Sequence, residues 1–94
     1  MNIFLTTTFK RAAKKCHRNQ IIKLEEAIAQ LQTNPFLGDL KQGDLAGVRV
    51  HKFTLISQLV LLAYTYDEQN NELCLLSFAP HENFYQNLKI QLKH

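Results

Sequence analysis

Four side chains able to act on a phosphodiester lie in the two short stretches VRVHKF and PHENFY. Arg49 carries a permanent charge on a planar fork that suits phosphate, and Lys52 carries a point charge. His51 and His81 each bear an imidazole, whose unperturbed pKa of about 6.5 lets it give or take a proton near neutrality. Cleavage of RNA through the ribose 2′-hydroxyl needs a base, an acid and cations, but no added nucleophile. These residue types therefore predict RNA cleavage without a metal.

Tyr85 follows His81 by four residues, one helical turn, where its ring could stack on a base or its hydroxyl could bind a phosphate. A structural interpretation competes with the catalytic one. His81 and Glu82 stand at the start of an expected helix, where a polar residue and an early carboxylate satisfy free amides and the helix dipole. His51 is equally compatible with an ordinary exposed strand histidine, and Arg49 with a partner carboxylate. Our hypothesis is that His81 is both a helix start and a working group.

The sequence indicates neither a metal site nor a cofactor. Its four histidines show no short ligand spacing, and it has only two cysteines, Cys16 and Cys74. Cys74 lies between two leucines in an apolar run, which is typical of a small buried side chain. We therefore expect no metal, no cofactor and no catalytic cysteine.

The elements that position these residues follow from the spacing of the apolar residues. An edge strand is expected over residues 1–6, then a helix that is capped by Thr7 or Thr8 and ends near His17. Asn19 is the expected cap of a second helix, because the apolar residues after it recur at spacings of three and four. Those residues are Ile21, Leu24, Ile28 and Leu31. The two helices should form a hairpin.

Asn34-Pro35 ends the second helix, because proline disfavours helical geometry in the residue before it. A loop of about a dozen residues follows, and loops of this length often carry function. After Gly47 the period becomes that of strands, in the runs VRVHKFTLI, QLVLLAYTY and ELCLLSF, which predict an antiparallel meander. In the first run the alternation points Arg49 and His51 one way and Lys52 the other.

Pro80 stops the last strand, and ENFYQNLKIQLKH should close the chain as a short helix. The prediction is one α+β domain over residues 1–94. It consists of an N-terminal helical hairpin packed on a twisted, mainly antiparallel four-stranded sheet with a short C-terminal helix. We expect the sheet to bring the strand of Arg49 and His51 beside the corner at His81, as one shallow surface.

Charge is concentrated near the N-terminus. The formal net charge is +3, and five cations fall within nine residues: Lys10, Arg11, Lys14, Lys15 and Arg18. This cluster fits a nucleic-acid partner or a solvated helix face. By their spacing, Lys10, Lys14 and Arg18 should lie on one helix face. No apolar run approaches the roughly 20 residues that span a bilayer, and the first residues lack the order of a secretory signal. We expect a cytoplasmic protein without a membrane partner.

The order of these motifs resembles the RelE/ParE superfamily of toxins from bacterial type II toxin-antitoxin systems. The resemblance runs from the helical hairpin through NPFLGDLKQGDLAGVRVHKF and LVLLAYTYDE to LLSFAPHENFYQNLK, nearly the whole chain. His81 followed by Tyr85 is similar to the terminal histidine-and-aromatic pair of the YafQ branch. RelE itself has an arginine in the third strand, where this chain reads QLVLL. Near the end of the fourth strand RelE has basic residues, and this chain has Pro80, His81 and Glu82 in their place. The pattern therefore favours a histidine-based relative such as YafQ or HigB.

The resemblance implies a ribosome-dependent mRNA endonuclease, inhibited by a cognate antitoxin and oligomeric only through the antitoxin complex. By position, Arg49 would steady the phosphate, His51 and His81 would divide the base and acid work, Lys52 would hold the backbone and Tyr85 would orient the substrate. The basic cluster would then dock on ribosomal RNA. A disordered antitoxin segment that folds on the chain would cover the site.

Two other functions stay open at this point. The ParE branch resembles the same fold and inhibits DNA gyrase by binding, without chemistry of its own. A small RNA-binding module would need stacking aromatics on an open sheet face, for which Tyr64 and Tyr66 are the candidates. Mapping mRNA ends in cells that express the chain separates these functions.

Overall fold

The computed structural model describes residues 1–82 and 84–93. Its elements are β1 (Asn2–Leu5), α1 (Thr7–Lys14), α2 (Arg18–Thr33), β2 (Asp39–Leu40), the 3-10 turn η1 (Gly43–Leu45), β3 (Arg49–Leu55), β4 (Gln58–Asp67), β5 (Glu72–Pro80) and α3 (Phe84–Leu92). Asn83 and His94, which the sequence assigns to the closing helix, lie outside the described residues. Within these limits no helix combines the length and the apolar character that a membrane span requires.

The strands form one sheet in the order β1-β5-β4-β3-β2. β1 runs parallel to β5, and every other neighbouring pair is antiparallel. The α+β class and the four expected strands are confirmed. The prediction of only four is wrong, because residues 39 and 40, placed in the long loop, pair with β3 as a fifth strand. Two residues are too short a run to show strand periodicity in a sequence.

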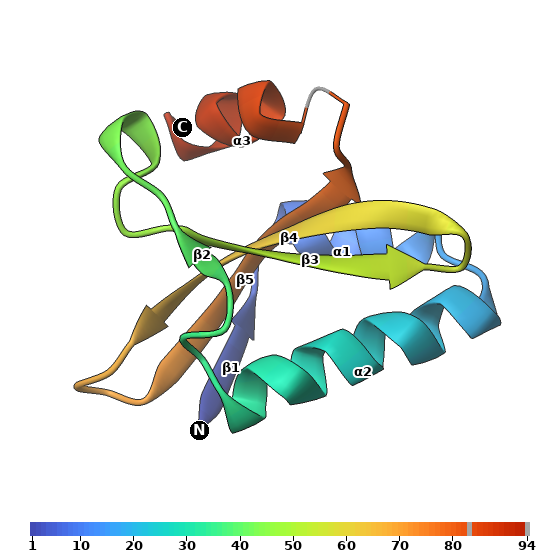
Figure 1. Ribbon diagram of the computed structural model, residues 1–94, viewed down its shortest axis with the longest axis horizontal. Coiled ribbons are helices and arrows are strands. Elements are labelled where there is room, and N and C mark those ends of the chain that lie inside the picture. The colour runs from blue at the N-terminus through green and yellow to red at the C-terminus, as the bar shows by residue number, and fades with distance from the viewer. Residues whose placement is uncertain (83, 94) are drawn as a thin grey trace.

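The helices cover the two faces of the sheet. Figure 1 shows α3 above the sheet, α2 below it and α1 behind it. α1 packs on β5 and α2 packs on β3. The predicted helical hairpin is therefore corrected in its packing, since each helix rests mainly on the sheet instead of on the other helix. We call the side covered by α1 and α2 the α2 face, and the other side the α3 face.

Each face has its own apolar core, and β4 contributes to both. Leu62 and Tyr64 belong to the cluster on the α2 face, whereas Leu61 and Ala63 belong to the cluster on the α3 face. All four are fully buried. This double burial explains why QLVLLAYTY reads as a continuous apolar run, as expected of a central strand.

The first helix begins and ends earlier than its sequence suggests. The Thr6 hydroxyl, and not that of Thr7 or Thr8, accepts a hydrogen bond from the Phe9 N–H at 3.1 Å. α1 stops at Lys14. An N-cap threonine one residue upstream satisfies the same free amides, so the cap residue type was predicted correctly and its position was not.

The second helix begins at Arg18, with His17 as its N-cap in place of the predicted Asn19. The His17 N–H donates to the Gln20 Oε1 at 2.7 Å, which fixes this start. The chain is not helical between Lys14 and Arg18, so Lys10, Lys14 and Arg18 do not continue one helix. The prediction that these three cations share one helix face is therefore wrong.

A β-bulge at Leu76 ties the two ends of the chain together. The register of β4 and β5 shifts between Ala63 and Tyr64, so that Leu76 is the extra residue of β5. Its carbonyl oxygen accepts a hydrogen bond from the Thr6 hydroxyl at 2.5 Å and another from the Gln91 Nε2 at 3.1 Å. The bulge thus fastens both the start of α1 and the end of α3.

Candidate functional site

His81 follows β5 directly and is exposed. Its carbonyl oxygen accepts a hydrogen bond from the Phe84 N–H at 3.2 Å, which closes the turn into α3. Its ring meets the ring of Tyr85 edge-on, with centroids 6.0 Å apart. Within residues 1–82 and 84–93, the His81 side chain has no hydrogen bond to the backbone of α3. The backbone of His81 therefore closes the turn into the helix while its side chain stays exposed to solvent.

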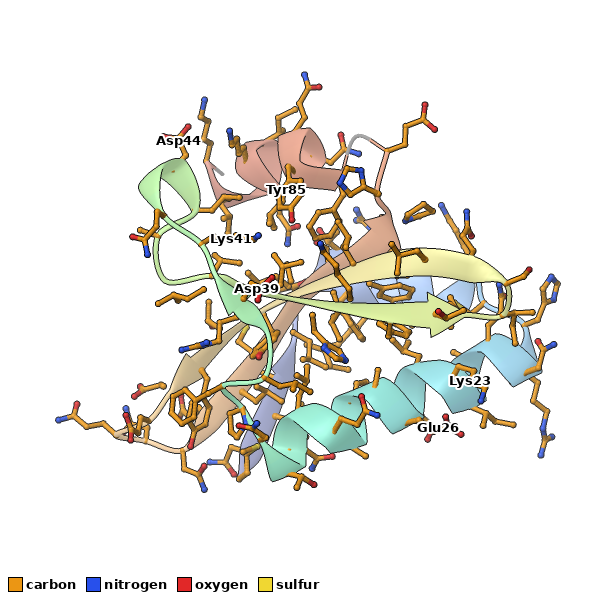
Figure 2. All side chains as sticks on the ribbon, in the orientation of Figure 1. Lys23, Glu26, Asp39, Lys41, Asp44 and Tyr85 are labelled. Carbon is orange, nitrogen blue, oxygen red and sulfur yellow. The ribbon has the colours of Figure 1, made fainter. Side chains whose placement is uncertain are left out.

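Tyr85 is held between a core residue and a cation. It is partly buried against the core of the α3 face, and its ring meets that of Phe84 edge-on at 5.1 Å. The Lys41 Nζ lies 5.5 Å from the centroid of the Tyr85 ring, a cation–π contact. Figure 2 shows Lys41 and Tyr85 on facing segments, with Lys41 on the chain that follows β2. Its N–H donates to the Val48 carbonyl at 2.9 Å, which anchors that segment.

Lys52 lies on the same face as α3. Its neighbour in alternation, Val50, is in the core of the α3 face. Lys52 pairs with Leu61, which in turn pairs with Ala79, so Lys52 lies two strands, about 10 Å, from the end of β5. Its side chain is exposed. Lys41, Lys52, His81 and Tyr85 together form what we call the α3-face site.

His51 lies on the opposite side of the sheet. Its ring stacks on that of Phe53 at 6.0 Å, and it lines a shallow hollow with residues of α2 and the segment after it: Glu26, Ala29, Gln30, Thr33 and Leu37. Its Nε2 is buried and has no hydrogen-bond partner among the described residues. Burial lowers the pKa of His51 below its usual value, because the charged ring would lose solvation.

Arg49 also lies on the α2 face, where it holds the loop before β2. Its Nη1 donates to the carbonyl oxygens of Gly38 at 2.9 Å and Phe36 at 3.3 Å. Its guanidinium carbon is 5.1 Å from the centroid of the Phe36 ring. The Tyr64 hydroxyl fastens the same loop, since it donates to the Pro35 carbonyl at 2.7 Å and accepts from the Gly38 N–H at 2.8 Å. The geometry gives Arg49 a role in loop structure.

The expectation that Arg49 and His51 share a surface with His81 is therefore wrong. Successive side chains of a strand point to opposite faces, so His51 and Lys52 cannot both line one site. The structure brings Lys52 to the side of His81 and Tyr85 and leaves Arg49 and His51 on the α2 face. It adds Lys41, which sequence reasoning missed. The signal that could have found Lys41 is the long loop between Gly38 and Gly47.

The basic cluster lies away from the α3-face site. Lys10, Lys14 and Arg18 are all exposed, the first two on α1 and the third at the start of α2. Their contact with ribosomal RNA stays a prediction. In the part of the chain that the structure describes, no group of three or more histidine, cysteine or carboxylate side chains could hold a metal ion.

Comparison with known families decides the class of protein. A family model described as the ParE-like toxin of type II bacterial toxin-antitoxin systems matches residues 3–89. The chain belongs to this family of ParE-like toxins. The resemblance to the RelE/ParE superfamily is thereby confirmed. No curated protein matches this ParE-like toxin in sequence.

Solved structures share the fold of this ParE-like toxin at low sequence identity. A mutant of the Escherichia coli toxin RelE in the free state has a TM-score of 0.75 at 11% identity, covering 97% of this chain and 95% of that one. A YoeB/ParE toxin from Agrobacterium tumefaciens has a TM-score of 0.71 at 16% identity, covering 86% and 99%. The RelBE2 toxin-antitoxin complex of Mycobacterium tuberculosis gives 0.69 at 21%, covering 85% and 96%. At these identities the likeness establishes the fold.

Proposed function

We propose that this ParE-like toxin is a metal-independent endoribonuclease that cuts mRNA on the ribosome and so arrests translation. The observation that carries the proposal is the α3-face site. It combines an exposed imidazole, a tyrosine whose ring meets that imidazole edge-on, and two lysines on one side of the sheet. An inhibitor that acts only by binding has no need of this combination.

The site can supply the groups that RNA cleavage through the 2′-hydroxyl requires. The imidazole of His81 takes the proton of the 2′-hydroxyl as the 2′ oxygen attacks phosphorus. The bond from phosphorus to the 5′ oxygen breaks, and the Tyr85 hydroxyl gives that oxygen its proton. The products are a 2′,3′-cyclic phosphate and a 5′-hydroxyl. The ammonium groups of Lys41 and Lys52 stabilise the negative charge that builds on the phosphate oxygens.

The openness of the site supports a substrate that is held by something else. His81 and Lys52 are exposed, so a single strand of RNA can reach them. The two rings and two cations contact one side of a nucleotide step, and they do not clamp the strand from both sides. A ribosome that holds its message in a fixed path would supply the orientation that this surface lacks.

A cognate antitoxin is the partner we propose. The structures that share this fold include RelBE complexes from Escherichia coli and Mycobacterium tuberculosis and an archaeal RelE-RelB complex from Pyrococcus horikoshii OT3. An exposed, constantly active site for cutting mRNA would harm the cell that makes it. We therefore assign control of the site to a protein that covers it in the cytoplasm.

Expression of the chain with and without its neighbouring gene tests the proposal. We expect growth arrest only without the neighbour, with new mRNA 5′ ends that carry a hydroxyl and depend on translation. The same purified chain should leave the supercoiling activity of DNA gyrase unchanged. Inhibition of gyrase with intact mRNA would instead establish the binding mode of inhibition.

A further inference from the structure

The two edges of the sheet differ in how they are protected. One edge is β1, and the other is formed by β2 and the rest of β3. Charged side chains on an edge strand discourage it from pairing with another strand. Asp39 and Lys52 lie on the β2 and β3 edge. β1 has the sequence NIFL, with no charged residue and no proline, so its edge is open to another strand.

Part of the backbone of β1 faces away from the sheet. The Thr6 N–H donates to the Leu75 carbonyl at 3.2 Å and so faces β5. Because only alternate residues of a strand bond to one neighbour, the backbone of Phe4 also faces β5. Ile3 and Leu5 then direct their N–H and C=O groups outward. Among the described residues, no strand lies beyond them.

Apolar side chains are exposed at this edge on both faces of the sheet. Phe4 is 50% exposed and Leu5 is 42% exposed. Phe4 pairs with Cys74, which packs on the core of the α3 face, so Phe4 lies on that face. Ile3 packs against the core of the α2 face, and Leu5, two residues further on, lies on the same face. A strand added here would find an apolar neighbour on each side.

A hollow lies beside Leu5 on the α2 face. Its volume is about 420 Å³. Its walls come from β1, β5 and α2, and they are Ile3, Leu5, Leu75, Glu25, Ile28 and Gln32. Most of these side chains are aliphatic. An aliphatic side chain that approaches along the β1 edge can therefore be buried in this hollow.

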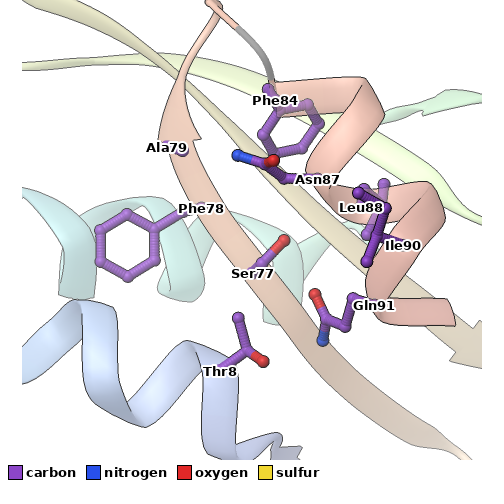
Figure 3. A pocket seen from close by; sticks show the side chains of 9 residues that line it. All are labelled: Thr8, Ser77, Phe78, Ala79, Phe84, Asn87, Leu88, Ile90 and Gln91. Carbon is purple, nitrogen blue, oxygen red and sulfur yellow. The ribbon is translucent and has the colours of Figure 1, made fainter. Parts of the chain in front are cut away.

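The start of α1 limits the length of this edge. β1 ends at Leu5, and the chain then turns into α1. Thr8, on α1, lies beside Ser77 and Gln91 in a separate hollow between α1, β5 and α3 (Figure 3). None of the described residues that line that hollow belongs to β1. An added strand can therefore pair with β1 only over residues 2–5.

We propose that β1 is the interface of a homodimer, in which β1 of a second copy pairs antiparallel to it about a two-fold axis at Phe4. In this register Phe4 lies opposite the Phe4 of the second copy, and Ile3 lies opposite Leu5. The backbone groups of Ile3 and Leu5 face outward, so each Ile3–Leu5 pair exchanges both of its main-chain hydrogen bonds. The strand is thus complementary to itself, as a two-fold interface requires.

The side chains favour this register over its neighbours. The two Phe4 residues form a pair without hydrogen bonds, the kind in which facing side chains lie closest, and aromatic pairs of this kind stabilise sheets. A slip of one residue would oppose side chains of different faces. A slip of two residues would place Phe4 against Asn2. In the proposed register Leu5 of the second copy lies beside Ile3, at the hollow.

The interface is small and uncharged. Pairing over the four residues of β1 falls short of the roughly 1,200–2,000 Å² that stable complexes bury. We therefore expect a weak dimer that forms between about 10 μM and 1 mM protein. An acidic or basic segment would find no opposite charge on β1, whereas a second copy of this uncharged strand matches it. This dimer differs from the expectation that the chain is oligomeric only through an antitoxin.

The dimer leaves the α3-face site open. A two-fold axis perpendicular to the sheet keeps the α3 faces of both copies on the same side. His81 follows the end of β5, about 20 Å along that strand from Leu75, the last residue paired with β1. The dimer therefore does not depend on the proposed function, and both sites would face the same direction.

Sedimentation equilibrium of the full chain from about 10 μM to 1 mM is the first test. Phe4→Lys places like charges opposite each other at the axis and should weaken self-association at least about tenfold. Leu59→Lys is the matched control, because Leu59 is also 50% exposed and lies on β4, outside the β1 edge. It should change the association little. Circular dichroism checks that both variants fold.

Disulfide cross-linking tests the register. Facing residues of a pair without hydrogen bonds have Cα atoms about 4.5 Å apart, within the range that a disulfide spans. Phe4→Cys should therefore cross-link two copies under mild oxidation. Asn2→Cys should not, because the two copies of residue 2 lie more than about 10 Å apart. Both use a chain with Cys16→Ser and Cys74→Ala, since Cys74 pairs with Phe4 in the same copy and would compete.

Four results would overturn the proposal. They are a monomer at every concentration, equal weakening by Phe4→Lys and Leu59→Lys, equal cross-linking at positions 4 and 2, and protection of the Ile3 and Leu5 amides from exchange by another protein but not by higher concentration. Each is read from the purified chain. They therefore separate from a failure of the proposed function, which is read from mRNA ends.

Discussion

His51 and His81 show how differently the two faces of the sheet treat the same side chain. His51 lies under α2, with a buried Nε2 that has no hydrogen-bond partner among the described residues and a pKa lowered by burial. His81 stands exposed on a corner, against an aromatic ring. One histidine is placed where a charge is costly, and the other is open to solvent. Residue type alone therefore does not tell which histidine is accessible to a substrate.

Arg49 and Lys52 repeat the contrast for cations. The guanidinium of Arg49 is hydrogen-bonded to two backbone carbonyls, and its charge holds a loop. The side chain of Lys52 is exposed on the face that carries Tyr85. The two lie only three residues apart on one strand, but the strand's alternation places their side chains on opposite faces of the sheet.

The largest expected effect separates the two histidines. His81→Ala should lower mRNA cleavage by roughly 10²- to 10⁴-fold, the usual span for removing a general acid or base. His51→Ala should leave the rate within a few-fold of the original, because its ring lies across the sheet from the site. The measurement is the rate of mRNA cleavage on programmed ribosomes with folded protein. Equal losses for the two variants would contradict the division of the faces.

The lysines of the α3-face site should give the next largest effect. Lys41→Met and Lys52→Met each remove one charge and keep the aliphatic stem. We expect each to slow cleavage by roughly 10- to 100-fold, since a hydrogen bond to a charged group contributes about 1.5–3 kcal/mol. Lys23→Met, on α2, is the matched control and should have no such effect. A loss that appears only in substrate affinity, with the rate at saturation unchanged, would limit the lysines to binding.

Substitutions on the α2 face should lower the free energy of unfolding instead of the rate of mRNA cleavage. Tyr64→Phe leaves the Pro35 carbonyl and the Gly38 N–H without their partner, which should cost about 1–3 kcal/mol in the free energy of unfolding. Gly38→Ala places a Cβ 2.8 Å from the Tyr64 hydroxyl and should cost a similar amount. Tyr66→Phe removes only an exposed hydrogen bond and serves as the control. Urea unfolding measures all three.

Salt dependence tests the basic helix. If Lys10 and Lys14 contact ribosomal RNA, Lys10→Glu with Lys14→Glu should reduce the slope of log affinity against log salt by about one for each lost phosphate contact. Ribosome binding should weaken while the cut sites stay the same. An unchanged slope would identify these residues as a solvated face.

The smallest effect is in pH dependence. Burial disfavours the protonated form of His51, so its folded-state pKa lies below the unfolded value of about 6.5. The unfolded chain then binds more protons, and stability is complete above about pH 6.5 and declines as the pH falls below it. His51→Gln should flatten this decline in the free energy of unfolding. Urea unfolding between about pH 7.5 and 5 measures it, because this range includes the unfolded-state pKa of the histidine.

Much of the fold could be predicted from the sequence, because periodicity reports which residues are buried. The continuous apolar run predicted β4 as a central strand buried on both faces, and the proline after Asn34 predicted the end of α2. The alternation in VRVHKF also separated His51 from Lys52. Periodicity could not predict which side chains share the site. The face of the sheet that α3 covers depends on the packing of Phe84 and Leu88. That packing joins residues far apart in the sequence.

Lys41 shows the same limit for a loop. Its segment has no periodicity, and its position over Tyr85 depends on the path that η1 and β2 impose. The caps were easier to identify by type than by position, since several threonines near the start of α1 could satisfy the same amides. Local chemistry therefore predicted kinds of residue, and long-range packing determined which of them meet.

The bulge carbonyl of Leu76 joins Thr6 across 70 positions of the chain, and the parallel pairing of β1 spans a similar distance. Contacts this distant form only after almost the whole chain has left the ribosome that makes it. Until then β1 has no partner and α3 has no sheet to pack on. A nascent copy therefore carries no assembled site, and the polypeptide becomes a toxin only on release. Synthesis itself imposes this delay, during which an inhibitor translated alongside can be present before the first active molecule.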